Sequence, residues 1–207
     1  MSCTQIKMMD NHMNEDNISE IVNPSASALI NSSRAIGYSP QTSIADLLDN
    51  SISAGAQNIW INFIWAGPDS YITILDDGNG ISEEDLTNAM RLGSQNPLTE
   101  RSENDLGRFG LGLKTASFAQ CKSLTVSSKN SNNKIHTRVW DLDLVMERDE
   151  WILLKEASDS NSIIINEKLN DSVSSGTLII WNSLDRMVGE EDVSDEKAKH
   201  QFYEIPN

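Results

Sequence analysis

Three glycines directly ahead of a short apolar segment form the part of this chain best suited to chemistry. The run extends from Asp105 to Ser117, and its glycines are Gly107, Gly110 and Gly112. Glycine lets backbone N–H groups approach a ligand closely, because no Cβ keeps the ligand away. The segment that follows reads as a helix, whose N-terminus adds unpaired N–H donors and a positive dipole end. Together with Arg108 and Lys114, the run predicts a phosphate-binding loop.

This loop differs from the two common nucleotide-binding fingerprints. Its spacing is G-x-x-G-x-G rather than the dinucleotide pattern G-x-G-x-x-G, and no predicted strand leads into it. It also lacks the G-K-[ST] ending of a Walker loop. Taken alone, the run fits a flexible surface loop before a helix as well as it fits a phosphate site. Its interpretation therefore depends on the other motifs.

A carboxylate and an amide four residues apart form the second motif. Asp46 and Asn50 fall on a predicted helix that Ser39 can cap, that has Pro40 at its first position and that ends before Gly55. Residues four apart on a helix share a face, so the two side chains can reach one point in space. Without further context the pair also fits two solvated polar residues.

The third motif is a polar turn at the end of a predicted strand. Residues 58–65 and 70–75 are rich in β-branched and aromatic residues and predict a hairpin. The second strand runs into Asp76-Asp-Gly-Asn-Gly80. An EF-hand loop needs a longer ligand series, a final glutamate and a preceding helix, which excludes that reading.

The remaining patterns predict a mixed α+β domain. Helices are expected at 25–35 and at 82–92, where Ser82 and Asp85 resemble a capping box. Residues 94–105 are polar without an apolar period, which is typical of a functional loop such as a lid. Further strands are expected at 123–128, 134–141, 151–156, 162–167 and 176–181, followed by an acidic, partly helical tail.

Composition excludes several classes of protein. The chain has 207 residues and a formal net charge of -15, which fits one globular domain and argues against nucleic-acid binding through a basic face. Cys3 and Cys121 are too few for a zinc site or a disulfide framework. We find neither an apolar stretch long enough for a membrane nor a signal-peptide core, and expect a cytoplasmic protein.

Four signals in a fixed order resemble the GHKL ATPases, a family that includes gyrase B subunits, sensor histidine kinases, MutL and MORC proteins. The signals are Asp46 to Asn50, Asp76 to Gly80, Gly107 to Gly112, and Gly176-Thr177. The resemblance covers residues 25–184 and is closest in look to MORC-type and MutL-type domains. It implies an α+β fold, a two-layer sandwich of the Bergerat type, with a mixed, mostly antiparallel sheet covered by helices on one face.

The resemblance also implies roles for individual residues. Asn50 would offer its side-chain oxygen to Mg²⁺, and Asp76 would accept a hydrogen bond from the adenine amino group. Thr177 would help to fix the adenine. The expected ATP-binding residues are Asn50, Asp76, Gly78, Gly80, Met90, Gly107, Gly110, Leu111, Gly112, Leu113, Lys114 and Thr177.

Two features depart from the family pattern. Most relatives carry a glutamate as general base, whereas this chain has Asp46, which keeps the carboxylate but is one methylene shorter. Relatives of the gyrase, MutL and MORC type continue into a domain that lends a lysine to the γ-phosphate, and too few residues follow Leu184 for such a domain. We expect a polar, disordered segment at 1–23, the ATP-binding domain at 24–188, and an acidic tail at 189–207 that begins a missing downstream region.

The expected function is an Mg²⁺-dependent ATPase module that uses ATP and releases ADP. Closure of its lid would control a homodimer or a protein partner. Two alternatives stay open. One is a histidine-kinase-type domain that transfers phosphate to a protein, and the other is a nucleotide-binding switch without hydrolysis.

Overall fold

A computed structural model describes residues 22–35, 37–93, 112–187 and 196–205. Its strands form one sheet of five, in the order β1-β2-β5-β3-β4, and every pairing between neighbours is antiparallel. The strands are β1 (Ile59–Ile64), β2 (Tyr71–Asp76), β3 (Ser123–Lys129), β4 (Ile135–Asp141) and β5 (Gly176–Asn182). The predicted α+β sandwich is confirmed, with a fully antiparallel sheet among the described strands.

The main core lies between the sheet and a layer of helices. The helices of this side include α1 (Ala26–Arg34), α2 (Pro40–Ser53), α3 (Glu83–Met90), α4 (Gly112–Phe118) and α5 (Leu142–Arg148). Leu47 of α2, Phe118 of α4 and Trp181 of β5 are almost completely buried there. Burying a large apolar side chain contributes roughly 1.5–3 kcal/mol. This layer therefore holds α2 and α4, which carry predicted site residues, firmly against the sheet.

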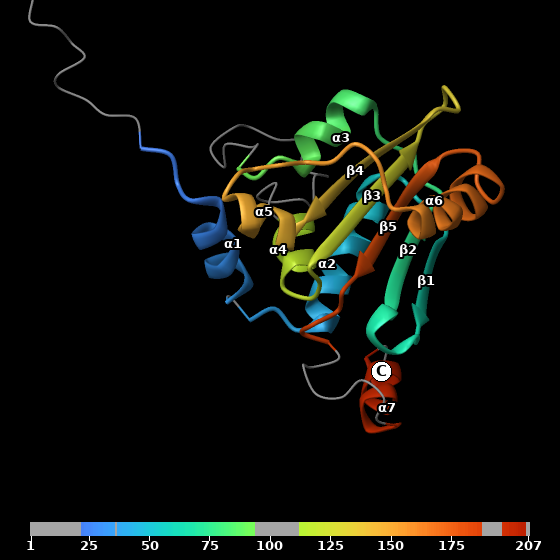
Figure 1. The fold of residues 1–207 in the computed structure, drawn as a ribbon. Coiled ribbons are helices and arrows are strands. Elements are labelled where there is room, and N and C mark those ends of the chain that lie inside the picture. Colours follow the sequence, from blue (N-terminus) through green and yellow to red (C-terminus); the bar gives the residue numbers. More distant parts are fainter. Residues whose placement is uncertain (1–21, 36, 94–111, 188–195, 206–207) are drawn as a thin grey trace, which may run out of the picture.

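The opposite face of the sheet carries a smaller cover. Helix α6 (Asp159–Ile165) continues into the π-helical turn η3 (Asn166–Asn170) and packs Ile165 and Leu169 onto Leu178 of β5. Figure 1 shows α6 on the side of the sheet away from α2. The sandwich thus has its thick helical layer on one face and a short helix on the other.

The strand expected at 162–167 is wrong, because these residues belong to α6 and η3. The Ser158 side chain caps the helix by accepting from the backbone N–H of Asn161. Ile165 and Leu169, four residues apart, then face the sheet together. The run of isoleucines favours a strand locally, and packing against the sheet overrides that preference.

The strand expected at 151–156 is also wrong, since only Leu154 pairs, through a single bridge to Val139. Helix α5 was not predicted, although Asp141 caps it by accepting from the N–H of Leu144. The other predicted elements agree with the structure to within a few residues at their ends. In α2, Ser39 accepts from the N–H of Thr42, as expected for its cap.

The last helix of the described residues is α7 (Glu196–Glu204), so the expectation of a partly helical tail is confirmed. Phe202 of α7 packs against Phe63 of β1 and against Trp65. A short 3-10 turn, η2 (Gly67–Asp69), joins β1 to β2. Most of the polar segment expected at 1–23 and the whole lid expected at 94–105 lie outside the described residues.

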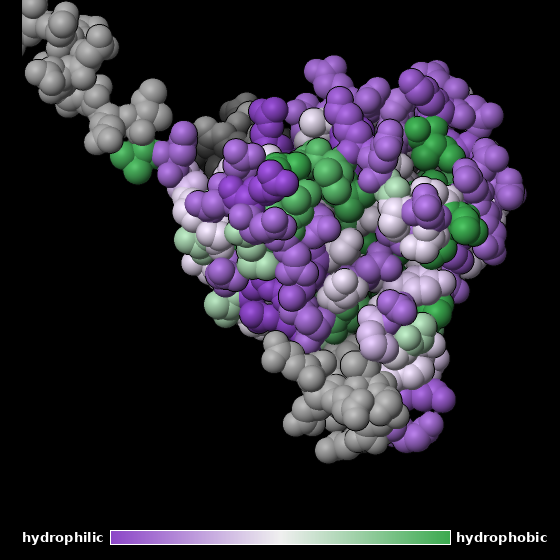
Figure 2. All heavy atoms as spheres, in the orientation of Figure 1, coloured by the Kyte–Doolittle hydropathy of each residue, from purple (hydrophilic) through white to green (hydrophobic). Residues whose placement is uncertain are grey.

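On the face shown in Figure 2, hydrophobic residues form small separate groups among hydrophilic ones. In the described part of the chain, no helix is long and apolar enough to cross a membrane.

Candidate functional site

Asp76 is the best-defined polar group at the end of β2. Only 5% of the residue is exposed, although it carries a carboxylate. Its Oδ1 accepts from the backbone N–H groups of Gly78 and Thr177 at 3.0 and 3.1 Å, and its Oδ2 accepts from the Ser51 hydroxyl at 3.0 Å. Donors from α2, from the turn after β2 and from β5 therefore hold this carboxylate in one orientation.

This arrangement leaves the carboxylate able to accept one more hydrogen bond. An ionised carboxylate has about four acceptor positions, and the described donors occupy two on Oδ1 and one on Oδ2. Burial raises the pKa of Asp76 above its usual value, while the hydrogen bonds from Gly78, Ser51 and Thr177 oppose that rise. The remaining position on Oδ2 suits a ligand that brings an N–H donor.

The glycines around Asp76 permit close contacts between backbone segments. A Cβ on Gly78 would lie 2.9 Å from the carbonyl oxygen of Ala54, at the end of α2. A Cβ on Gly80, whose φ is +67°, would clash with the carbonyl of Lys129 at the end of β3. In this structure both predicted glycines bring protein segments together beside Asp76.

Gly176 belongs to the same arrangement, although the sequence motif that contains it assigned a role only to Thr177. A Cβ there would clash with the backbone carbonyl of Asp76. The Gly-Thr pair at the start of β5 thus serves two purposes. Its glycine allows β5 to approach the aspartate, and the N–H of Thr177 then binds the carboxylate.

The Thr177 side chain contacts one other hydroxyl group, that of Ser128. Its Oγ1 is 2.9 Å from Oγ of Ser128 on β3, and the residue is 7% exposed. Ser51 and Ser128 are functional candidates that sequence reasoning missed. The only signal for Ser51 was its position next to Asn50 on α2, and Ser128 gave none, since it is one of several serines in a strand.

Asp46 and Asn50 lie one turn apart on α2, and both are half-buried. Helix α2 packs on α4, and a Cβ placed on Gly112 would lie 3.9 Å from Oδ2 of Asp46. The structure therefore brings the predicted base next to the last glycine of the predicted phosphate loop. Gly107, Gly110 and Leu111 lie outside the described residues.

Lys114 lies in the protein interior, with 1% of the residue exposed. Its Nζ donates to the carbonyl oxygen of Ala89 in the last turn of α3 at 2.6 Å. Burial lowers the pKa of Lys114 to about 8. In this structure its ammonium group binds a helix end, and its predicted contact with phosphate stays a prediction.

The two remaining candidates are apolar. Met90 is fully buried at the end of α3, and its carbonyl oxygen accepts from the Trp140 indole at 2.9 Å. Leu113 is half-buried and packs against the main core. Both contribute to the packing between the helical layer and the sheet.

No group of three or more His, Cys, Asp or Glu side chains in the described residues could hold a metal ion. Mg²⁺ commonly takes one or two protein oxygens and completes its shell with water and substrate phosphates. The amide oxygen of Asn50, on the same helix face as the Asp46 carboxylate, suits an ion that arrives with a phosphate ligand.

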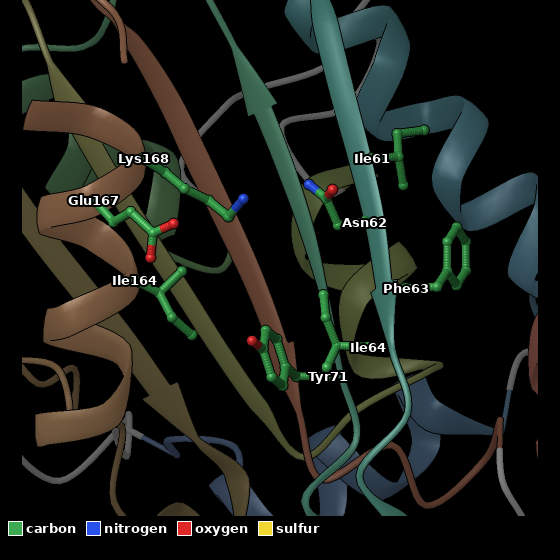
Figure 3. Close-up of a pocket in the computed structure, with 8 residues that line it drawn as sticks. All are labelled: Ile61, Asn62, Phe63, Ile64, Tyr71, Ile164, Glu167 and Lys168. Atoms are coloured by element: carbon green, nitrogen blue, oxygen red, sulfur yellow. The ribbon is translucent and has the colours of Figure 1, made fainter. Parts of the chain in front are cut away.

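A pocket of about 440 Å³ lies on the other face of the sheet. Figure 3 shows Tyr71 and Asn62 on the strands opposite Ile164 and Lys168 of the α6–η3 segment. Asp76 binds Ser51 of α2, on the thick helical layer, so this pocket is separate from the candidate site. It shares no residue with the four predicted motifs.

Comparison with known proteins finds several relatives. The ATPase morc-1 of Caenorhabditis elegans is 29% identical over 90 residues, which is 44% of this chain and 10% of that protein. The DNA mismatch repair protein MutL of Dictyoglomus turgidum is 34% identical over 92 residues, 44% of this chain and 16% of its own length. The MORC family CW-type zinc finger protein 3 of Mus musculus is 28% identical over 93 residues, 44% of this chain and 10% of its length.

The matched stretches thus span between a tenth and a sixth of the length of these relatives. The profile of one family, described as histidine kinase-, DNA gyrase B- and HSP90-like ATPase, matches residues 38–177. That stretch is more than half of the 207 residues and contains all the candidate site residues. The chain belongs to this family of ATPases.

Proposed function

We propose that this domain binds ATP beside α2 and the ends of β2 and β5, with the adenine amino group donating to Asp76. The observation that carries this proposal is the buried carboxylate of Asp76, held by three donors with one acceptor position left on Oδ2. An exocyclic amino group supplies the N–H donor that this position requires. The membership of the chain in an ATPase family supports the same ligand.

The phosphate end of the ligand would lie toward α4. Asp46 and Asn50 share one face of α2, and Asp46 lies next to Gly112. In this proposal Asn50 would offer an oxygen to Mg²⁺, which would offset the charge of the phosphates, and Asp46 would orient and polarise the attacking water. The chain's own residues thereby separate into a base-binding end around Asp76 and a phosphate end on α2 and α4.

Hydrolysis is the reaction we assign to this arrangement, with ATP binding and release acting as a switch for a second copy or a protein partner. Transfer of phosphate to a protein and binding without hydrolysis are the alternatives. Phosphate release from Mg·ATP, measured over hours with a sensitive reporter and together with transfer of labelled γ-phosphate to a protein, separates them. Release in Mg²⁺ and none in excess chelator would support the ATPase. No release of phosphate and no labelled protein, with ATP still bound, would leave a nucleotide-binding switch without hydrolysis.

Lys114 supplies a test of the phosphate end. Burial lowers its pKa to about 8, so at about pH 8.5 much of the side chain is neutral in the free protein. A nearby triphosphate would favour the ammonium form and raise this pKa, so we expect ATP binding to take up protons near that pH. Calorimetry in two buffers with different enthalpies of ionisation measures this uptake.

Adenosine, which lacks phosphate, is the matched ligand and should show no uptake. The Lys114→Met variant should lose the uptake seen with ATP. Equal proton uptake with adenosine and with ATP, or full proton uptake in Lys114→Met, would contradict a contact between Lys114 and phosphate. Lys114 would then keep only its contact with the Ala89 carbonyl.

A further inference from the structure

The hydroxyl group of Ser128 connects three segments around the candidate adenine site. Ser128 is fully buried, at 0% exposure. Its Oγ accepts from the backbone N–H of Ile81 at 2.7 Å and lies 3.0 Å from the carbonyl oxygen of Gly176 and 2.9 Å from Oγ1 of Thr177. One side chain on β3 thus contacts the residue after the Asp76–Gly80 turn and the first two residues of β5.

The number of donors at this point determines the direction of the hydrogen bonds. A serine hydroxyl has one proton to donate and two acceptor positions. The Gly176 carbonyl can only accept, so the Ser128 proton satisfies it, while the Ile81 N–H takes one acceptor position. The second acceptor position is left for the proton of Thr177. With its proton directed at Ser128, the Thr177 oxygen has only acceptor positions for other groups.

We propose that Ser128 is a positioning residue that sets the base specificity of the site by holding Thr177 as an acceptor. This inference rests on the proposed function and extends it to a residue that does not touch the nucleotide. Asp76 and Thr177 then form a pair of acceptors, joined by the Thr177 N–H that binds Asp76. Two acceptors match the amino group of adenine and repel the oxygen that guanine carries at the corresponding position.

The test compares the affinities for ATP and GTP in Ser128→Ala and in a matched control, Ser127→Ala. Ser127 is also 0% exposed, but its hydroxyl bonds Thr137 on β4 and points to the opposite face of the sheet. In Ser128→Ala the Thr177 proton is free to turn toward the ligand. We expect the ATP-to-GTP affinity ratio to fall about 3–10-fold, as for the loss of one oriented hydrogen bond. Ser127→Ala should keep the parent ratio, even where its melting temperature falls by a similar amount.

Thr177→Val provides a second, independent variant, because it removes the hydroxyl with almost no change in volume. Thr177→Val should by itself lower the ATP-to-GTP affinity ratio. Adding Ser128→Ala should change this ratio no further, since both substitutions act through the Thr177 hydroxyl. If the parent binds ATP but Ser128→Ala or Thr177→Val keeps the parent's ATP-to-GTP affinity ratio, the inference about Ser128 is wrong and the proposed function stands. A parent that binds no ATP would overturn the proposed function as well.

Discussion

Replacing Asp46 with alanine should lower the rate of ATP hydrolysis by about 10²–10⁴-fold, the usual contribution of a placed general base. Affinity for ATP should change by no more than about 3-fold, because Asp46 is proposed to contact the attacking water rather than the adenine ring. We place Asp46 near the attacking water because it lies on α2, next to Gly112 and one turn from Asn50. Single-turnover phosphate release with saturating Mg·ATP measures the rate separately from binding.

Two variants control this result. Asp46→Glu restores the side chain that most relatives use and should keep the rate or raise it. Asp49→Ala removes a more exposed carboxylate three residues further along the same helix and should leave the rate unchanged. If Asp46→Ala hydrolyses ATP as fast as the parent, another group is the base, and binding without hydrolysis becomes the favoured function.

Asp76→Asn should weaken ATP binding by about 10–100-fold, the range expected for losing a hydrogen bond to a charged acceptor. The amide can keep the two backbone donors of Gly78 and Thr177 on its oxygen. Its NH₂ group then takes the place of Oδ2. Because this group and the adenine amino group are both donors, the proposed hydrogen bond between them is lost. The variant keeps the size of the side chain, so the loss is expected in binding more than in folding.

The neighbouring aspartate is the matched control. Asp77 accepts from the N–H groups of Gln57 and Asn58 and from the Asn58 side chain, and it anchors the start of β1. Asp77→Asn should therefore leave ATP affinity close to that of the parent. Equal losses in Asp76→Asn and Asp77→Asn would show that the effect comes from the fold of the turn.

Local signals in the sequence located the main helices and strands. Ser39 and Pro40 define the start of α2, and the β-branched runs around Ile61 and Ile179 define the edge strand β1 and the central strand β5. These features depend on residues within one turn or one strand, where capping and side-chain period act directly. The four motifs were recognised in the same way, from short stretches in a fixed order.

The features that were missed depend on contacts between distant segments. Ser51 is 25 residues from Asp76, and Ser128 is 49 residues from Thr177, so no local pattern marks either contact. The isoleucines of α6 have strand-like propensity, and only the sheet beneath them makes a helix the better solution. The burial of Lys114 against the Ala89 carbonyl likewise depends on how α3 packs beside α4.

The central claim is that Asp76 makes this an adenine-specific nucleotide site, and titration calorimetry of the unmodified protein with Mg·ATP and Mg·GTP tests it most directly. The buried carboxylate, held by Ser51, Gly78 and Thr177, offers an acceptor to the amino group of adenine. We predict that ATP binds at least about 10-fold more tightly than GTP. Equal affinity for the two nucleotides, or no heat of binding with ATP at millimolar concentration, would contradict the assignment.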